Sequence, residues 1–216
     1  MTIRWLGHSC FVLTESTGTA IVVDPYGHVG YDLPEGLVAD AVTVSHNHYD
    51  HSNTDAVSGD PEIFSKPGTF ELKGVSITGI KTFHDREEGE SRGSNVIFKF
   101  RMDGIDVCHL GDIGEDCSAQ LVESLLPVDV LMIPVGGKYT LDAEQAKEYV
   151  DLLMPDIVIP MHYKTKSLAI DIDRAEPFLK LFDEEYVEIL ETDTVDLDRE
   201  DLGNKVTKVK LLRRLK

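Results

Sequence analysis

The chain has 216 residues, of which 42% are hydrophobic and 7% aromatic. This composition can bury a globular core and is not that of a disordered or collagen-like protein. Acidic residues outnumber basic ones by 39 to 21, which gives a formal net charge of −18 at pH 7. Because a phosphate backbone repels such a charge, the balance argues against a nucleic-acid partner.

The chain's length and apolar pattern favour a single domain over residues 1–216. No apolar run reaches the roughly 18 residues that a membrane span needs, and no signal-peptide core follows residue 6. We therefore expect a cytoplasmic protein without membrane contact. Its three cysteines, Cys10, Cys108 and Cys117, are widely separated, which favours reduced thiols over a disulfide framework. Dimers or larger oligomers are left open.

Short runs rich in β-branched residues open the chain and predict a meander of strands at residues 3–5, 10–14 and 20–24. A further strand is predicted at residues 41–44. Later strands are predicted at residues 75–80, 95–102, 105–109, 130–134 and 157–161. The Asp-Gly pair at positions 103 and 104 predicts a hairpin turn between two of them.

Apolar side chains recur at helical spacing in two later segments, which predicts amphipathic helices at residues 118–126 and 143–154. Thr140 or Asp142 can cap the first free amides of the second helix. The first part of the chain is predicted to form hairpins, and in the later part strands alternate with helices. This order indicates two packed sheets with helices on the outside.

A third helix is predicted at residues 173–182, although Pro177 leaves its course open because proline lacks an amide donor. The segment 205–216 contains six basic residues and no acidic one, and it follows the strongly acidic segment 183–201. We expect the basic segment to be a final strand with solvated flanks that faces the acidic segment.

The strongest chemical signal is a cluster of histidines and an aspartate directly after the predicted strand 41–44. His46, His48, Asp50 and His51 fall within six positions. Alternate side chains of an extended segment share a face, so His46 and His48 can reach one metal ion together, whereas Asp50 and His51 need another direction. Two adjacent metal positions are therefore more natural than one. These ligand types suit zinc, and also iron or manganese.

The segment 46–51, His-Asn-His-Tyr-Asp-His, resembles the HxHxDH signature of the metallo-β-lactamase-fold superfamily. This resemblance implies an α+β, four-layer αββα sandwich with a dinuclear metal site at one edge of its two sheets. Further positions match in order, each after a predicted strand. His84 resembles the third ligand of the first metal, Asp112 the carboxylate that bridges both metals, and His162 the last ligand of the second metal.

The resemblance implies two sets of ligands that share one carboxylate. The first metal would be held by His46, His48, His84 and Asp112, and the second by Asp50, His51, His162 and Asp112. Taken singly, the three later residues would more often be structural. Their order after strands, given the first cluster, favours ligands.

Two further segments, Gly-His-Ser-Cys-Phe at 7–11 and Val-Gly-Gly-Lys-Tyr-Thr at 135–140, are similar to a compact zinc-dependent hydrolase subgroup of this superfamily that includes ascorbate-phosphate lactonase-like proteins. The chain lacks the GHTxGH-type third motif of the classical lactamases. The resemblance therefore implies hydrolysis of a substrate other than a lactam.

Two metal ions lower the pKa of bound water to about 7, which makes hydroxide available at neutral pH. We expect a metal-dependent hydrolase that uses this hydroxide on a small ester, lactone or phosphoester. Asp50 is expected to orient the hydroxide or accept its proton, or to act only as a ligand. An iron-dependent oxidoreductase on the same fold and a non-catalytic metal-binding module are the alternatives.

Candidate substrate contacts give weaker signals. His8 lies in the loop after the first strand, where it could contact the substrate, support a metal ligand or serve only in packing. Arg92 lies in the polar loop after His84. Lys138, beside two glycines, and Lys164, near His162, could contact an anionic group. His109 is expected to be a buried structural residue.

Overall fold

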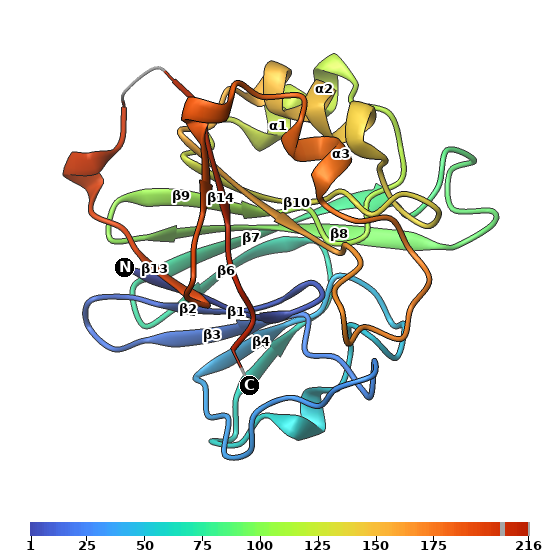
Figure 1. Cartoon of the computed structure of the whole chain (residues 1–216). Coiled ribbons are helices and arrows are strands. Elements are labelled where there is room, and N and C mark those ends of the chain that lie inside the picture. The colour runs from blue at the N-terminus through green and yellow to red at the C-terminus, as the bar shows by residue number, and fades with distance from the viewer. Residues whose placement is uncertain (204–205, 216) are drawn as a thin grey trace.

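The computed structural model describes residues 1–203 and 206–215. Two β-sheets face each other, and three helices lie on the outer face of the larger sheet (Figure 1). Loops and one turn of 3₁₀ helix, η1 (Thr54–Ala56), cover the outer face of the smaller sheet. The predicted α+β sandwich is confirmed, and its fourth layer consists mainly of loops.

The smaller sheet has six strands in the order β13-β1-β2-β3-β4-β5. They are β1 (Thr2–Gly7), β2 (Cys10–Thr14), β3 (Ala20–Val23), β4 (Ala41–Thr43), β5 (Glu62–Phe64) and β13 (Thr194–Asp196). The predicted meander β1–β3 is antiparallel, and β4 and β5 extend it in parallel. Alternate residues of β3 face opposite sides: Ile21 and Val23 pack between the sheets, and Val22 packs under the outer loops.

The larger sheet has eight strands in the order β12-β14-β11-β10-β9-β8-β7-β6. They are β6 (Gly68–Leu72), β7 (Val75–Phe83), β8 (Ser94–Met102), β9 (Ile105–His109), β10 (Val130–Pro134), β11 (Ile157–Met161), β12 (Val187–Ile189) and β14 (Lys208–Leu211). The predicted turn joins β8 to β9 through Asp103 and Gly104, with φ angles of 51° and 74°. Positive φ at both central residues matches the twist of a tight hairpin.

The helices begin at side-chain caps or at proline. Helix α1 (Ala119–Leu125) follows Ser118, whose hydroxyl accepts a hydrogen bond from the Leu121 amide. Helix α2 (Ala143–Leu153) is capped by Asp142, one of the two predicted caps. No helix in residues 1–203 and 206–215 is both long enough and apolar enough to cross a bilayer.

The third predicted helix is wrong in extent, because α3 covers only Glu176–Leu179. Pro177 lies in its first turn, where a missing amide donor is tolerated. Upstream, the Asp173 backbone is tied elsewhere: its amide donates to the Gly136 carbonyl, and its carbonyl accepts from the Lys164 amide. These bonds hold the segment as a loop. Two short 3₁₀ turns, η2 (Glu184–Tyr186) and η3 (Arg199–Asp201), follow α3.

The basic segment at the end of the chain forms the predicted final strand, β14, which inserts between β11 and β12. Lys210 pairs with Glu188, and Arg213 pairs with Glu191, so the basic and acidic segments do face each other. Lys205 and Lys216, which also belong to the predicted segment, lie outside the described residues.

We expect Asp142→Ala to lower the free energy of unfolding by about 1 kcal/mol, measured by urea denaturation. Asp142 accepts a hydrogen bond from the Gln145 amide at 2.9 Å, and the Gln145 side chain accepts one from the Asp142 amide at 3.0 Å. Glu144→Ala, a neighbouring first-turn change that removes no cap, is the control. Equal stability of the two variants would contradict this assignment.

Candidate metal centre

All the predicted ligands follow strands whose carboxyl ends meet at one edge of the sandwich. In the smaller sheet β1, β3 and β4 run in one direction, and in the larger sheet β7, β9 and β11 do. His46 follows β4, His84 follows β7, and Asp112 and His162 follow β9 and β11. The topology thus gathers side chains from distant parts of the sequence.

Left-handed backbone turns the chain sharply at several of these strand ends. His8, Asp24 and His162 have φ angles of 50°, 47° and 49°. Gly111 also has a positive φ, and a Cβ there would lie 2.3 Å from Asn95 Oδ1. Glycine at position 111 therefore lets Asn95 come close to the backbone, and the Asp112 amide donates a hydrogen bond to Asn95 Oδ1 at 3.0 Å.

The Asp112 carboxylate lies at the centre of the site. Its Oδ2 atom is 3.2 Å from Nε2 of His51 and of His162, 3.4 Å from Nε2 of His84 and 3.8 Å from Nε2 of His46. All four rings and the carboxylate are buried. One carboxylate thus contacts both predicted sets of ligands.

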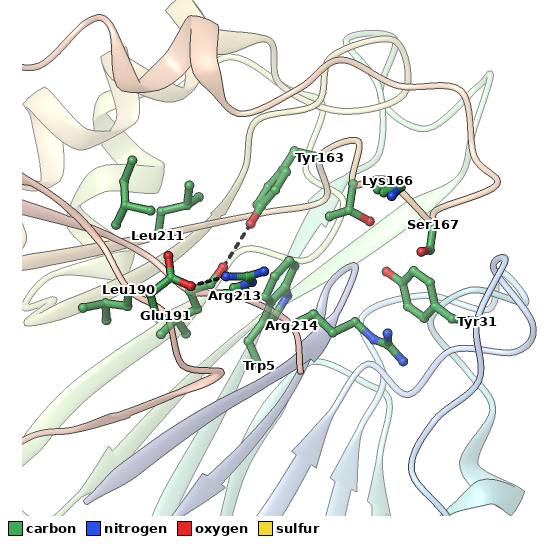
Figure 2. A pocket seen from close by; sticks show the side chains of 13 residues that line it. Trp5, Tyr31, Tyr163, Lys166, Ser167, Leu190, Glu191, Leu211, Arg213 and Arg214 are labelled. Carbon is green, nitrogen blue, oxygen red and sulfur yellow. Dashed lines mark hydrogen bonds and ion pairs between the residues drawn. The ribbon is translucent and has the colours of Figure 1, made fainter. Parts of the chain in front are cut away.

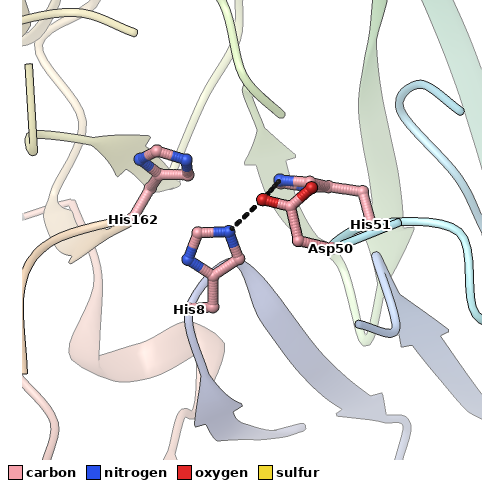
Figure 3. Close-up of side chains that lie close together, drawn as sticks. All are labelled: His8, Asp50, His51 and His162. Carbon is pink, nitrogen blue, oxygen red and sulfur yellow. Dashed lines mark hydrogen bonds and ion pairs between the residues drawn. The ribbon is translucent and has the colours of Figure 1, made fainter. Parts of the chain in front are cut away.

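Seven of the remaining donors form two groups around it, and a third group, of Asp24, His46 and His51, links the two. In each group the potential ligand atoms lie within 4.8 Å of one another: the first consists of His46, His48 and His84, and the second of His8, Asp50, His51 and His162. Figure 3 shows the second group, in which His8, His162 and the neighbouring pair Asp50 and His51 come from three separate segments. The structure therefore brings together all seven predicted ligands and adds His8.

Several atoms at the centre have no hydrogen-bond partner among the described residues. They include His46 Nε2, His51 Nε2 and Asp112 Oδ1, each shielded from solvent. An unsatisfied buried polar atom costs about 1–3 kcal/mol. Imidazole nitrogens and carboxylate oxygens directed at a common point are the donor set of zinc and related cations. The residues present therefore fit a metal centre.

A residue that the sequence analysis missed, Asp24, orients two of these rings. Its Oδ2 atom accepts hydrogen bonds from His51 Nδ1 at 2.8 Å and from the Ser45 hydroxyl at 2.5 Å. Because the Ser45 proton points to Asp24, the Ser45 oxygen accepts from His46 Nδ1, 2.9 Å away. Both rings thus hold a proton on Nδ1 and direct Nε2 at Asp112, as metal-binding histidines require.

The electrostatics of the site favour the protonation states of metal ligands at His46 and Asp112 but favour the protonated ring at His51. Burial lowers the pKa of His46 to about 3. Burial would raise the pKa of Asp112, but His162 and His51 beside it hold that pKa well below its usual range. Burial lowers the pKa of His51, yet Asp112 and Asp24 outweigh it and raise that pKa above 6.5. Metal binding would therefore release a proton from His51.

The His8 side chain forms a hydrogen bond with the Asp50 carboxylate. Its Nε2 atom is 3.1 Å from Asp50 Oδ2, and its ring is 4.4 Å from that of His162. Burial lowers the pKa of His8 to about 4, so the neutral ring donates its proton to the carboxylate. The carboxylate pKa is in turn held below its usual range: burial would raise it, but the His8 hydrogen bond and His51 lower it. His8 is buried and does not line the cavity described next.

A cavity of about 390 Å³ opens beside the two groups of ligands. It is lined by His48, Tyr49, Asp50, His84, Arg92, Asp112, Tyr139, His162, Ile170 and Asp171. The Arg92 guanidinium lies 4.6 Å from the centre of the Tyr139 ring. Lys138 pairs with Asp171. Neither Lys138 nor Lys164 is among the lining residues.

The other sequence candidates have structural partners. Lys164 donates to the carbonyls of Leu168 and Ile170 at 2.6 and 2.8 Å. His109 donates from Nε2 to the Ser9 carbonyl and accepts the Gly111 amide at Nδ1, at 2.9 and 3.1 Å. The expected buried structural role of His109 is confirmed.

We expect Asp24→Asn to weaken metal binding by about tenfold to a hundredfold, because one acceptor oxygen is lost from the group that orients His46 and His51. Competition with a fluorescent chelator measures the affinity. Asp60→Asn is the matched control, since Asp60 is exposed and has a similar left-handed φ of 55°. Unchanged affinity in Asp24→Asn would argue against this role.

Comparisons with known proteins agree with the site. Residues 2–162 match the β-lactamase superfamily domain. A UPF0173 metal-dependent hydrolase of Methanoculleus marisnigri is 34% identical over 191 residues, which cover 76% of this chain and 82% of that protein. Another, from Methanoregula boonei, is 31% identical over 193 residues, which cover 76% of this chain and 83% of that protein.

A solved structure extends the likeness to three dimensions. A Thermotoga maritima protein, described as a zinc-dependent hydrolase of the metallo-β-lactamase superfamily, matches with a TM-score of 0.80 and 38% identity. The match covers 98% of this chain and 99% of that one. Together with the two-sheet sandwich and the histidine-rich centre at its edge, these matches show that the chain belongs to the metallo-β-lactamase superfamily, among its metal-dependent hydrolases.

Proposed function

We propose that the protein hydrolyses a small ester, lactone or phosphoester with the help of two divalent cations. The observation that carries the proposal is the position of the Asp112 carboxylate, within 4 Å of four histidine rings from two adjoining groups of potential ligands. A single carboxylate between two such groups is suited to bridge a pair of metal ions.

The proposed ligand sets follow the two groups. One cation would be held by His46, His48, His84 and Asp112, and the other by Asp50, His51, His162 and Asp112. Zinc is favoured by the imidazole and carboxylate donors, and iron or manganese would accept the same set. When bound, a metal pair activates water and polarises the carbonyl or phosphoryl group that is attacked.

Asp50 is proposed to accept the proton of the attacking water. Its carboxylate lines the cavity and is ionised at neutral pH, although its lowered pKa makes it a weaker base than an ordinary aspartate. The hydrogen bond from His8 Nε2 fixes the orientation of Asp50 Oδ2. His8 is thus a positioning residue, and Asp50 is the residue that contacts the reacting water.

The shape of the cavity supports a small-molecule substrate. Its volume of about 390 Å³ lies within the usual range of about 300–1,000 Å³ for small-ligand sites. Two tyrosines, Tyr49 and Tyr139, and Ile170 supply an apolar wall. Arg92 is the one lysine or arginine among the described lining residues, and we propose that it contacts an anionic group of the substrate.

We expect Asp112→Asn to lose bound metal and to reduce hydrolysis by about a hundredfold or more, because the oxygen shared by both groups is weakened as a ligand. Elemental analysis and a panel of lactones, phosphodiesters and thioesters measure the two effects. Asp116→Asn, an exposed change after the same strand, is the control.

Full hydrolysis by metal-depleted protein would exclude this function. Oxygen consumption by the iron-loaded protein, without hydrolysis of the panel, would instead support the oxidoreductase. Stoichiometric metal binding with neither reaction would support a non-catalytic module.

We expect His8→Asn to lower kcat by about tenfold to a hundredfold with unchanged metal content, because asparagine adopts the left-handed backbone but is too short to reach Asp50. His8→Gln, which is longer and retains an amide donor, should recover part of the loss. His28→Asn, at an exposed ring, is the control. Loss of metal in His8→Asn would instead make His8 a ligand.

A further inference from the structure

A second cavity, of about 420 Å³, is lined in part by Trp5, three residues before His8, and by Tyr163, which follows His162. It is lined by Trp5, Tyr31, Tyr163, Thr165, Lys166, Ser167, Ile189, Leu190, Glu191, Leu211, Leu212, Arg213 and Arg214 (Figure 2). None of these residues lines the cavity at the metal centre. We propose that this cavity binds a small organic anion with a flat, apolar body.

Aromatic rings form one wall of the cavity. Trp5 from β1 and Tyr163 from the segment after β11 are stacked, with ring centres 5.4 Å apart and planes at 26°. The Tyr163 hydroxyl donates to the Leu212 carbonyl at 3.4 Å, which ties this wall to the end of β14. Leucine side chains and Ile189 complete the apolar lining. Stacked rings beside aliphatic groups favour a flat apolar ligand.

The charge of the lining selects an anion. Three basic residues, Lys166, Arg213 and Arg214, and one acidic residue, Glu191, line the cavity, although the whole chain carries a net charge of −18. Arg213 pairs with Glu191. In residues 1–203 and 206–215, no carboxylate forms an ion pair with Lys166 or Arg214. Among the described residues, Lys166 and Arg214 therefore have no carboxylate within ion-pair distance.

Arg214 is held in place before any ligand binds. Its Nε and Nη2 atoms donate to the carbonyls of Leu6 and Asp32 at 3.0 and 3.3 Å, and its guanidinium lies 4.0 Å from the centre of the Tyr31 ring. Gly7 makes this stack possible, since a Cβ there would lie 2.8 Å from both Arg214 and Tyr31. A fixed guanidinium loses little entropy when it binds a carboxylate, phosphate or sulfonate.

The Tyr31 hydroxyl adds a hydrogen-bonding group to the lining of the cavity. The Tyr31 hydroxyl is buried, and its oxygen lies near the Thr165 side chain and the His8 backbone, which act as hydrogen-bond donors to it. It lines the same cavity as Arg214. Because both neighbours donate to the Tyr31 oxygen, its own proton is available to an oxygen of the ligand.

Trp5 is the single tryptophan of the chain, so its fluorescence reports on ligand binding in this cavity. The probe is 8-anilinonaphthalene-1-sulfonate, a sulfonate on a flat naphthalene ring, and its uncharged counterpart is N-phenyl-1-naphthylamine. Titration of the metal-loaded protein should show one saturable sulfonate site per chain, with quenching of Trp5 emission and energy transfer to the probe. Weak, unsaturable binding, or saturation without any change in Trp5 emission, would overturn the proposal.

Variants of the cationic side chains test the recognition of the anion. We expect Arg214→Gln to weaken sulfonate binding about tenfold and to change binding of the neutral probe less than twofold. Arg101→Gln, at a surface arginine that pairs with Asp106 outside the cavity, is the matched control.

A second variant is needed because Arg214→Gln also removes hydrogen bonds that stabilise the fold. Lys166→Gln changes an exposed side chain and should weaken only the sulfonate, by about twofold to threefold. Equal affinity of wild type and both variants for the sulfonate would overturn the proposal. Because the readout is binding, its failure is distinct from a failure of the proposed hydrolysis.

Discussion

The buried carboxylate of Asp112 is the constraint around which the site is built. A carboxylate removed from water is costly unless positive or polarisable groups surround it. Here four imidazole rings supply that surrounding, and they come from loops after β4, β7 and β11. The two sheets can meet at this edge only if these loops converge, so the local electrostatics and the global topology support each other.

The hydrogen bonds behind the rings give the site its precision. Asp24 and Ser45 form a short chain that fixes the tautomers of His46 and His51, and the Ser45 amide also donates to Asp24 at 2.8 Å. A carboxylate that accepts three hydrogen bonds is held rigidly at the end of β3. Rigid supporting groups of this kind keep ligand atoms at the spacing that a small cation needs.

Much of this arrangement could be predicted from the sequence, and the exceptions have physical causes. The histidine cluster after β4 was conspicuous because four potential ligands lie within six positions. The four strands that escaped prediction, β5, β6, β12 and β13, are the edges of the two sheets. Edge strands are short and partly solvated, so their apolar pattern is weak.

Single residues that act only in three dimensions were also missed. Asp24 follows an apolar strand as many turn residues do, and only its contact with His51 reveals its role. The second cavity combines Trp5, Tyr31 and Arg214, which are distant in sequence and share no motif. What could have drawn attention to Asp24 is its place directly after a buried strand, where functional side chains often gather.

The left-handed backbone conformations of His8, Asp24 and His162 limit the stability of the protein. Each such conformation costs a residue with a Cβ about 1 kcal/mol or more, a penalty that glycine would avoid. A chain selected only for durability would relax at these three positions and lose the side chains that its chemistry needs. At these three residues the backbone conformation that activity needs therefore lowers thermal stability. Substitutions that raise stability without loss of activity must lie elsewhere in the sandwich.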